Sequence, residues 1–176
     1  MDDDSIIRPL HPDDAPRLAE LLTRSRAFMA PFEPEREEDW FTVAGQALAV
    51  ERSLAQQEAG QVVASAILSE TGEVAGRINL NNIVRGAFQS CSMGYWLDEG
   101  HTGRGLASRA VAAMVRIAFV DLGLHRVEAG TLVHNTASQK VLLSNDFQQF
   151  ALAPSYLRIA GRWQDHLLFQ RISPID

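Results

Sequence analysis

The chain has 176 residues, of which 46% are hydrophobic and 22% charged, a composition typical of a globular protein with one hydrophobic core. A net charge of −6 without a Lys/Arg cluster argues against a nucleic-acid-binding face. The single cysteine, Cys91, excludes a disulfide framework and a cysteine-rich zinc site. No apolar run reaches the roughly 20 residues of a membrane span. The acidic N-terminus is unlike a signal peptide, so we expect a cytoplasmic protein.

Hydrophobic periodicity predicts strands and helices in a single domain spanning residues 1–176. In chain order these are a strand over 6–10, a helix over 13–25 capped by Asp13, a helix from about 36 to 59, strands over 62–69, 74–83 and 88–97, a helix over 106–118, a strand over 126–133, a helix over 135–144 capped by Asn135, and strands over 147–151 and 163–172. The last two strands are predicted to be joined by a long connection with its tip at Ala160-Gly161.

The predicted order is therefore β-α-α-β-β-β-α-β-α-β-β. Strands over 62–97 form an antiparallel meander, whereas the strand–helix–strand unit over 93–133 requires a parallel pair. We expect an α/β (α+β) fold with one mixed, mostly antiparallel sheet of about seven strands, flanked by about four helices. Ligands bind such sheets where neighbouring strands diverge at their carboxyl ends.

The turn between the strand that ends at Leu97 and the helix that begins at Leu106 is the strongest candidate ligand site. It contains Gly103 and Gly105 immediately before the helix. A helix N-terminus has unpaired amides and a partial positive charge, so this turn predicts a phosphate-bearing ligand. The glycine pair alone is a weak signal, and the run matches neither a P-loop nor a Rossmann fingerprint.

Four longer runs are more specific in their order and spacing. They are GYWLDEGHTGRGLASRAV (94–111), LGLHRVEAGTLVHNTAS (122–138), NDF (145–147) and GRWQDHLLFQRI (161–172). Together they closely resemble the GNAT superfamily of N-acetyltransferases, and more narrowly its ribosomal-protein alanine N-acetyltransferase (RimJ/RimL) branch. The resemblance is strong over 90–172 and weaker over 5–85.

The resemblance implies an enzyme that transfers an acetyl group from acetyl-CoA to a primary amine, by direct attack and without a metal. The implied cofactor site combines the backbone of the fourth strand, the pyrophosphate-binding turn and polar residues of the cleft wall. Its residues are Tyr95, Trp96, Leu97, Thr102, Gly103, Arg104, Gly105, Leu106, Ala107, Ser108, Asn135, Ser138 and Lys140. An amide of the fourth strand is expected to stabilise the oxyanion.

Departures from the family pattern redirect the catalytic assignments. Thr102 stands where the family usually has Gln or Arg, so the turn is expected to bind mainly through its backbone. Leu142 replaces the tyrosine that protonates the leaving thiolate in many relatives, and Ser138 is the predicted catalytic donor instead. Asp146 replaces a glycine, and we expect it in a left-handed conformation.

The general base is not matched, because Ser92 occupies the position of the family carboxylate. Glu33, Glu35, Tyr156 and His134 remain alternatives, but a non-catalytic role is favoured for each: solvated loop charges for the glutamates, a packing aromatic for Tyr156 and a surface residue beside the cap for His134. At pH 7 roughly 14% of an α-amine but only about 0.04% of a lysine amine is neutral. A site without an obvious base therefore favours a peptide or protein N-terminus as acceptor.

Alternative functions remain open. One is acetylation of a small amine such as an aminoglycoside or polyamine, and another is a catalytically weak acyl-CoA-binding sensor or assembly protein. A homodimer is expected from the family, with no nucleic-acid or membrane partner. Asp98, Glu99 and His101 are interpreted as a solvated loop rather than a metal site, and Cys91 as a buried side chain.

Overall fold

The computed structural model describes residues 6–174 and contains one seven-stranded mixed sheet. The strands are β1 (Ile7–Pro9), β2 (Val63–Leu68), β3 (Val74–Val84), β4 (Ser90–Leu97), β5 (Arg126–Leu132), β6 (Gln148–Ile159) and β7 (Arg162–Ile172). The α-helices are α1 (Ala15–Arg24), α2 (Arg26–Met29), α3 (Val43–Glu58), α4 (Leu106–Arg116) and α5 (Thr136–Leu143). Short turns of helix lie between them: η2 (Pro12–Asp14), η3 (Ala30–Phe32), η4 (Glu38–Phe41), η5 (Glu99–His101) and η6 (Ile117–Asp121).

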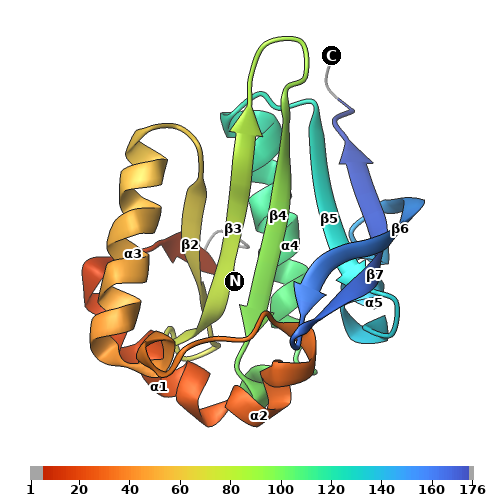
Figure 1. Ribbon diagram of the computed structural model, residues 1–176. Helices are drawn as coiled ribbons and strands as arrows, with labels where there is room; N and C mark the ends of the chain where they lie inside the picture. Colours follow the sequence, from red (N-terminus) through yellow and green to blue (C-terminus); the bar gives the residue numbers. More distant parts are fainter. Residues whose placement is uncertain (1–5, 175–176) are drawn as a thin grey trace.

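The strand order is β1-β2-β3-β4-β5-β7-β6, and β4–β5 is the parallel pair. This confirms the predicted fold class and element order. Helices α4 and α5 cover one face of the sheet, and α1 and α3 cover the other (Figure 1). No helix within residues 6–174 is both long and apolar enough to cross a membrane.

Alternation along the strands divides the hydrophobic core between these two faces. Ile78, Leu80 and Val111 belong to the larger cluster, which lies between the sheet and α4. Ala64 and Leu18 belong to the smaller cluster beneath α1 and α3. Successive side chains along a strand, β4 included, therefore point to opposite faces of the sheet.

Two helix starts were predicted wrongly, because side chains elsewhere satisfy the first amides. Asp13 caps no helix: the His11 ring accepts from the Asp13 amide, and α1 begins later, at Ala15. The helix expected from about residue 36 begins at Val43, where the Thr42 hydroxyl accepts from the Gly45 amide at 3.0 Å.

The predicted long connection before β7 is also wrong. Strand β6 continues to Ile159 and forms a hairpin with β7 whose tight turn is Ala160-Gly161. A register shift between Ala153 and Leu157 accommodates Pro154, and Ser155 has a positive φ of 48°. The bulge interrupts the alternating pattern, which is why the sequence indicated only the first part of this strand.

Candidate active site

The sheet opens between β4 and β5. The two strands pair only at Ser90–Arg126, Cys91–Val127 and Ser92–Glu128. Beyond these pairs they diverge toward their carboxyl ends, while β4 stays paired with β3 as far as Leu97. One edge of β4 is therefore free of β5 along the segment that the sequence analysis assigned to the cofactor.

The turn from β4 into α4 presents a series of unpaired amides beside this opening. Within residues 6–174, no acceptor is recorded for any backbone amide from Gly103 to Ser108, and the first bond of the helix joins the Arg109 amide to the Gly105 carbonyl. Gly103 and Gly105 have φ values of 73° and 75°, a conformation that disfavours other residues. Leu106 is buried and anchors the helix in the core. These amides are positioned for an anionic ligand.

Side chains around the turn are less directly engaged than its backbone. The Thr102 hydroxyl donates to the Glu99 carbonyl at 2.9 Å, and Ser108 is hydrogen-bonded to Asn145 of the segment after α5. Arg104 and Lys140 are exposed cations in the turn and in α5. Their charges and the unpaired amides make this corner of the molecule electropositive.

Tyr95 joins β4 to α5 across the opening. Its hydroxyl lies 2.7 Å from Ser138 Oγ and 3.3 Å from the Ser138 carbonyl oxygen. Burial raises the pKa of Tyr95 to about 12, so the phenol stays protonated at neutral pH. Asn135 accepts from the Ser138 amide at 3.1 Å, which confirms the predicted cap and fixes the start of α5. Trp96, the next residue, packs on the opposite face against α1 and α3.

This role of the Tyr95 side chain was missed from the sequence, where the residue was assigned through its backbone. Strand alternation could have found it, since Tyr95 shares the face of Met93 and Cys91. That face carries α4 and α5. Cys91 is buried, as interpreted from the sequence, and burial raises the pKa of its thiol to about 12.

Asp98 at the end of β4 is fully buried, so the interpretation of its turn as solvated is wrong at this residue. Its carboxylate accepts from Arg24 at 2.6 and 2.9 Å, from Ser25 at 2.7 Å and from the Gly100 amide at 3.0 Å. Burial raises the pKa of this carboxyl, but the hydrogen bonds from Arg24, Ser25 and His101 outweigh it and hold the pKa well below its ordinary value. Asp98 thus ties α1 to the start of the glycine turn.

The opposite face of the opening is bordered by the segment before α3 and the tip of the β6–β7 hairpin, which lie side by side (Figure 1). The Ala160 amide donates to the Glu33 carbonyl at 2.9 Å. A pocket of about 500 Å³ beside this contact is lined by Leu22, Arg26, Met29, Ala30, Glu33, Pro34, Glu35, Arg36, Glu37, Phe41 and Ala160. Burial raises the pKa of Glu33, an effect that Arg36 only partly offsets.

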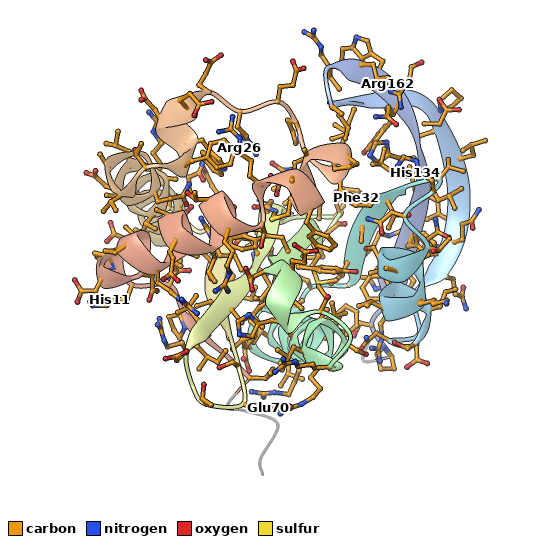
Figure 2. The ribbon with its side chains drawn as sticks, turned by 90° about the horizontal axis from the view of Figure 1, so that it is seen from below. His11, Arg26, Phe32, Glu70, His134 and Arg162 are labelled. Atoms are coloured by element: carbon orange, nitrogen blue, oxygen red, sulfur yellow. The ribbon has the colours of Figure 1, made fainter. Side chains whose placement is uncertain are left out.

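The remaining candidate bases lie apart from one another. His134 is exposed just beyond β5, and its ring lies 5.9 Å from that of Phe32 in η3 (Figure 2). Tyr156 on β6 is half-exposed, with its ring 5.5 Å from that of His166. Ser92 contacts the Asn81 carbonyl at 3.4 Å and brings no base to the site.

Two aspartates near the site, Asp165 and Asp146, stabilise or occupy particular backbone conformations. Asp165 accepts from the Ser155 amide at 2.8 Å and so holds the backbone of the β6 bulge. Asp146 has a φ of 59°, the left-handed conformation expected from the sequence. Across residues 6–174, no group of three or more His, Cys, Asp or Glu side chains is placed to hold a metal ion.

Comparison with known families gives a direct match to this architecture. Residues 5–148 match the family model of the acetyltransferase (GNAT) domain. The chain belongs to the GNAT acetyltransferase family. As a GNAT enzyme it uses acetyl-CoA as the acetyl donor.

Three similar proteins extend this match beyond the residues of the family model. The GNAT chain is 33% identical over 171 residues to the probable N-acetyltransferase YjcK of Bacillus subtilis, covering 97% of this chain and 94% of the relative. It is 30% identical over 170 residues to the ribosomal protein uS5-alanine N-acetyltransferase of Escherichia coli, covering 96% and 88%. The structure of Mycobacterium smegmatis RimJ in complex with CoA-disulfide is similar with a TM-score of 0.90 at 29% identity, covering 95% and 81%.

Proposed function

We propose that this GNAT enzyme acetylates the α-amine at the N-terminus of a peptide or protein. The opening of the sheet between β4 and β5 carries the proposal, because it allows donor and acceptor to meet from opposite faces. The similarity to the uS5-alanine N-acetyltransferase supports a protein terminus as acceptor. The larger neutral fraction of an α-amine at neutral pH supports it as well.

On the donor side, the amides from Gly103 to Ser108 would bind the pyrophosphate of acetyl-CoA. The free edge of β4 at Tyr95, Trp96 and Leu97 would pair with the pantetheine arm, and one of its amides would stabilise the oxyanion. Arg104 and Lys140 would meet the remaining phosphate charge.

Ser138 would protonate the departing thiolate. A serine hydroxyl is a weak acid, so it acts best when another group replaces its proton as it leaves. The Tyr95 hydroxyl, at 2.7 Å from Ser138 Oγ, is placed to do this, and its own raised pKa keeps a proton available. Cleavage of the C–S bond then accompanies proton transfer along Tyr95 and Ser138 to the sulfur.

On the acceptor side, the carboxylates of Glu33, Glu35 and Glu37 border one pocket. They outnumber its two guanidinium groups, Arg26 and Arg36, of which Arg26 is paired with Glu38. A terminus that carries a positive charge would be attracted to these carboxylates. The same three carboxylates favour a second candidate, a polyamine or aminoglycoside with several ammonium groups. The two candidates differ in the number of charges that the acceptor must carry.

The test is release of free thiol from acetyl-CoA in the presence of N-terminal peptides, polyamines and aminoglycosides. We expect turnover with peptides, highest for termini whose first residue is small. Turnover with polyamines or aminoglycosides alone would support the second candidate. CoA binding without turnover on any acceptor would contradict both and indicate a sensor.

We further propose that residues 1–176 act as one domain, in the cytoplasm where its proposed acceptors are made, and that two copies associate. Exposed apolar side chains support association: Val43 and Leu48 on α3, and Leu152, Leu157 and Trp163 on the β6–β7 hairpin. Sedimentation velocity is the measurement, and a single species of monomer mass would contradict the homodimer.

A further inference from the structure

His166 on β7 is a buried histidine with one ring nitrogen unused. The side chain is only 3% exposed, and Nδ1 lies 3.0 Å from the carbonyl oxygen of Gln164. A carbonyl oxygen can only accept, so Nδ1 carries the proton and a neutral ring has its lone pair on Nε2. No residue within 6–174 forms a hydrogen bond or ion pair with Nε2. A buried imidazole with a fixed tautomer and a free lone pair is suited to accept a proton.

The free edge of this ring faces the opening of the sheet. His166 pairs with Leu132 at the end of β5, and its Cδ2 lies 3.8 Å from where a Cβ on Gly130 would stand. Nε2 is bonded to Cδ2, so it lies along the same edge of the ring. The Nδ1 edge is turned instead toward the Gln164 carbonyl.

Two glycines lie at this part of the opening. Gly94 and Gly130 each lie two residues beyond Ser92 and Glu128, the last pair that joins β4 to β5. Both glycines are exposed, and both are on the face that carries α1 and α3. His166 is on that face too, whereas Tyr95 and Ser138 are on the other. The proposed proton donor and this imidazole thus flank the opening from opposite sides.

We propose that His166 is the general base of the acetyl transfer, with Nε2 accepting the proton of the acceptor amine directly or through one water. This rests on the proposed function. The amine nitrogen attacks the thioester carbonyl, the C–N bond forms and the C–S bond breaks. The nitrogen's proton passes to Nε2 and later to solvent. The thiolate takes its proton from Ser138, which regains one from solvent through Tyr95, so protons and charge balance over the cycle.

Each element packed around His166 places a titratable group near it. Tyr156 comes from β6 at a ring distance of 5.5 Å, and Glu128 on the same face of β5 is 3.7 Å from an arginine of its own strand. Asp165 is bound to the β6 backbone, and Glu33 lies in the segment that meets the hairpin tip.

The decisive variant is His166→Asn, whose amide nitrogen can replace Nδ1 as donor to Gln164 while Nε2 is lost. We expect kcat with a peptide acceptor to fall by about 100-fold or more at neutral pH, with acetyl-CoA affinity within about threefold of the wild type. The loss should shrink as pH rises, because the amine then becomes neutral unaided. The matched control is His125→Asn, an exposed histidine before β5, which should leave kcat unchanged.

Two further measurements separate catalysis from folding. Imidazole added to His166→Ala should restore part of kcat. In the unaltered protein, nitrogen NMR should find Nδ1 protonated and a His166 titration that coincides with the inflection of kcat/KM against pH. An unchanged pH profile and kcat in His166→Asn, or a titration far from that inflection, would overturn this role while leaving the acetyltransferase intact. A wild type inactive on every acceptor would instead refute the proposed function, and the role of His166 with it.

Discussion

At the scale of single residues, Tyr95 on β4 and Asp98, immediately after that strand, determine how the site is built. Tyr95 contacts Ser138 across the opening, and Asp98 receives the guanidinium of Arg24 from α1. The sequence indicated Ser138 through a family resemblance and Asp98 only as part of an acidic turn. Neither contact is local, with separations of 43 and 74 residues: strand alternation gives the face on which Tyr95 lies, but no spacing rule gives the partner of either side chain.

Tyr95→Phe tests the proton relay. We expect kcat to fall about tenfold with little change in acetyl-CoA affinity, because Ser138 keeps its position but loses the group that replaces its proton. Ser138→Ala should lower kcat further, and the double variant should be no worse than Ser138→Ala alone, since the two act as one unit. Steady-state kinetics would measure kcat, and calorimetry would measure acetyl-CoA affinity. Ser69→Ala in the β2–β3 turn is the control. Additive losses in the double variant would contradict a relay.

Asp98→Asn tests the link between α1 and the glycine turn. At pH 7 we expect the free energy of unfolding to fall by about 2–3 kcal/mol, a moderate loss because Arg24 is half-exposed and can be solvated. The folded-state pKa of Asp98 is lowered, so its stabilisation is complete above the unfolded pKa of about 3.9 and disappears as pH falls toward the folded value.

The difference in the free energy of unfolding between wild type and Asp98→Asn should therefore become smaller below about pH 4. Urea unfolding at a series of pH values measures it. If this difference in unfolding free energy stayed constant down to strongly acidic pH, the ionised carboxylate of Asp98 would contribute nothing to stability.

At the scale of elements, the glycine turn combines backbone conformation with ligand access. Gly105 has a φ of 75°, and a Cβ there would meet nothing within 4 Å. The same is true of Gly86 in the β3–β4 turn, with a φ of 72°. The two glycines therefore carry similar backbone strain when replaced, but only Gly105 adjoins the unpaired amides.

Gly105→Ala and Gly86→Ala form a matched pair. Each should lower the free energy of unfolding by about 1–2 kcal/mol, the cost of a left-handed non-glycine residue. Only Gly105→Ala should weaken CoA binding, by about tenfold, as measured by calorimetry. Equal CoA affinities in the two variants would place the pyrophosphate away from this turn.

Most elements follow from the sequence, and the errors have physical causes. The stripe from Leu106 to Met114 predicted α4, and Asn135 predicted the start of α5. The α3 start was placed too early because Trp40 continued the helical pattern, although it lies in η4. The β6 bulge at Ser155 concealed the second half of that strand. Caps and bulges depend on side-chain geometry that periodicity does not register.

At the scale of the whole molecule, the proposed function depends on a sheet that is open in its middle. The strand–helix–strand pattern predicted the parallel pair, which the structure confirms, and the glycine turn predicts a ligand site at its carboxyl end. The proposed place of the acceptor could not be located from the sequence, because the segment with Glu33 and the hairpin tip at Ala160 meet only in the folded chain. His166 was likewise inaccessible to sequence reasoning, since its free edge is defined by Gly130 of another strand.

The most direct test of the account is mapping of the acetylated atom. A peptide with a free N-terminal alanine and an internal lysine would be incubated with the enzyme and acetyl-CoA, then sequenced by tandem mass spectrometry. The account predicts a single acetyl group on the α-amine and release of one CoA for each peptide modified. Acetylation of the lysine in preference to the terminus, or CoA release without peptide modification, would contradict it.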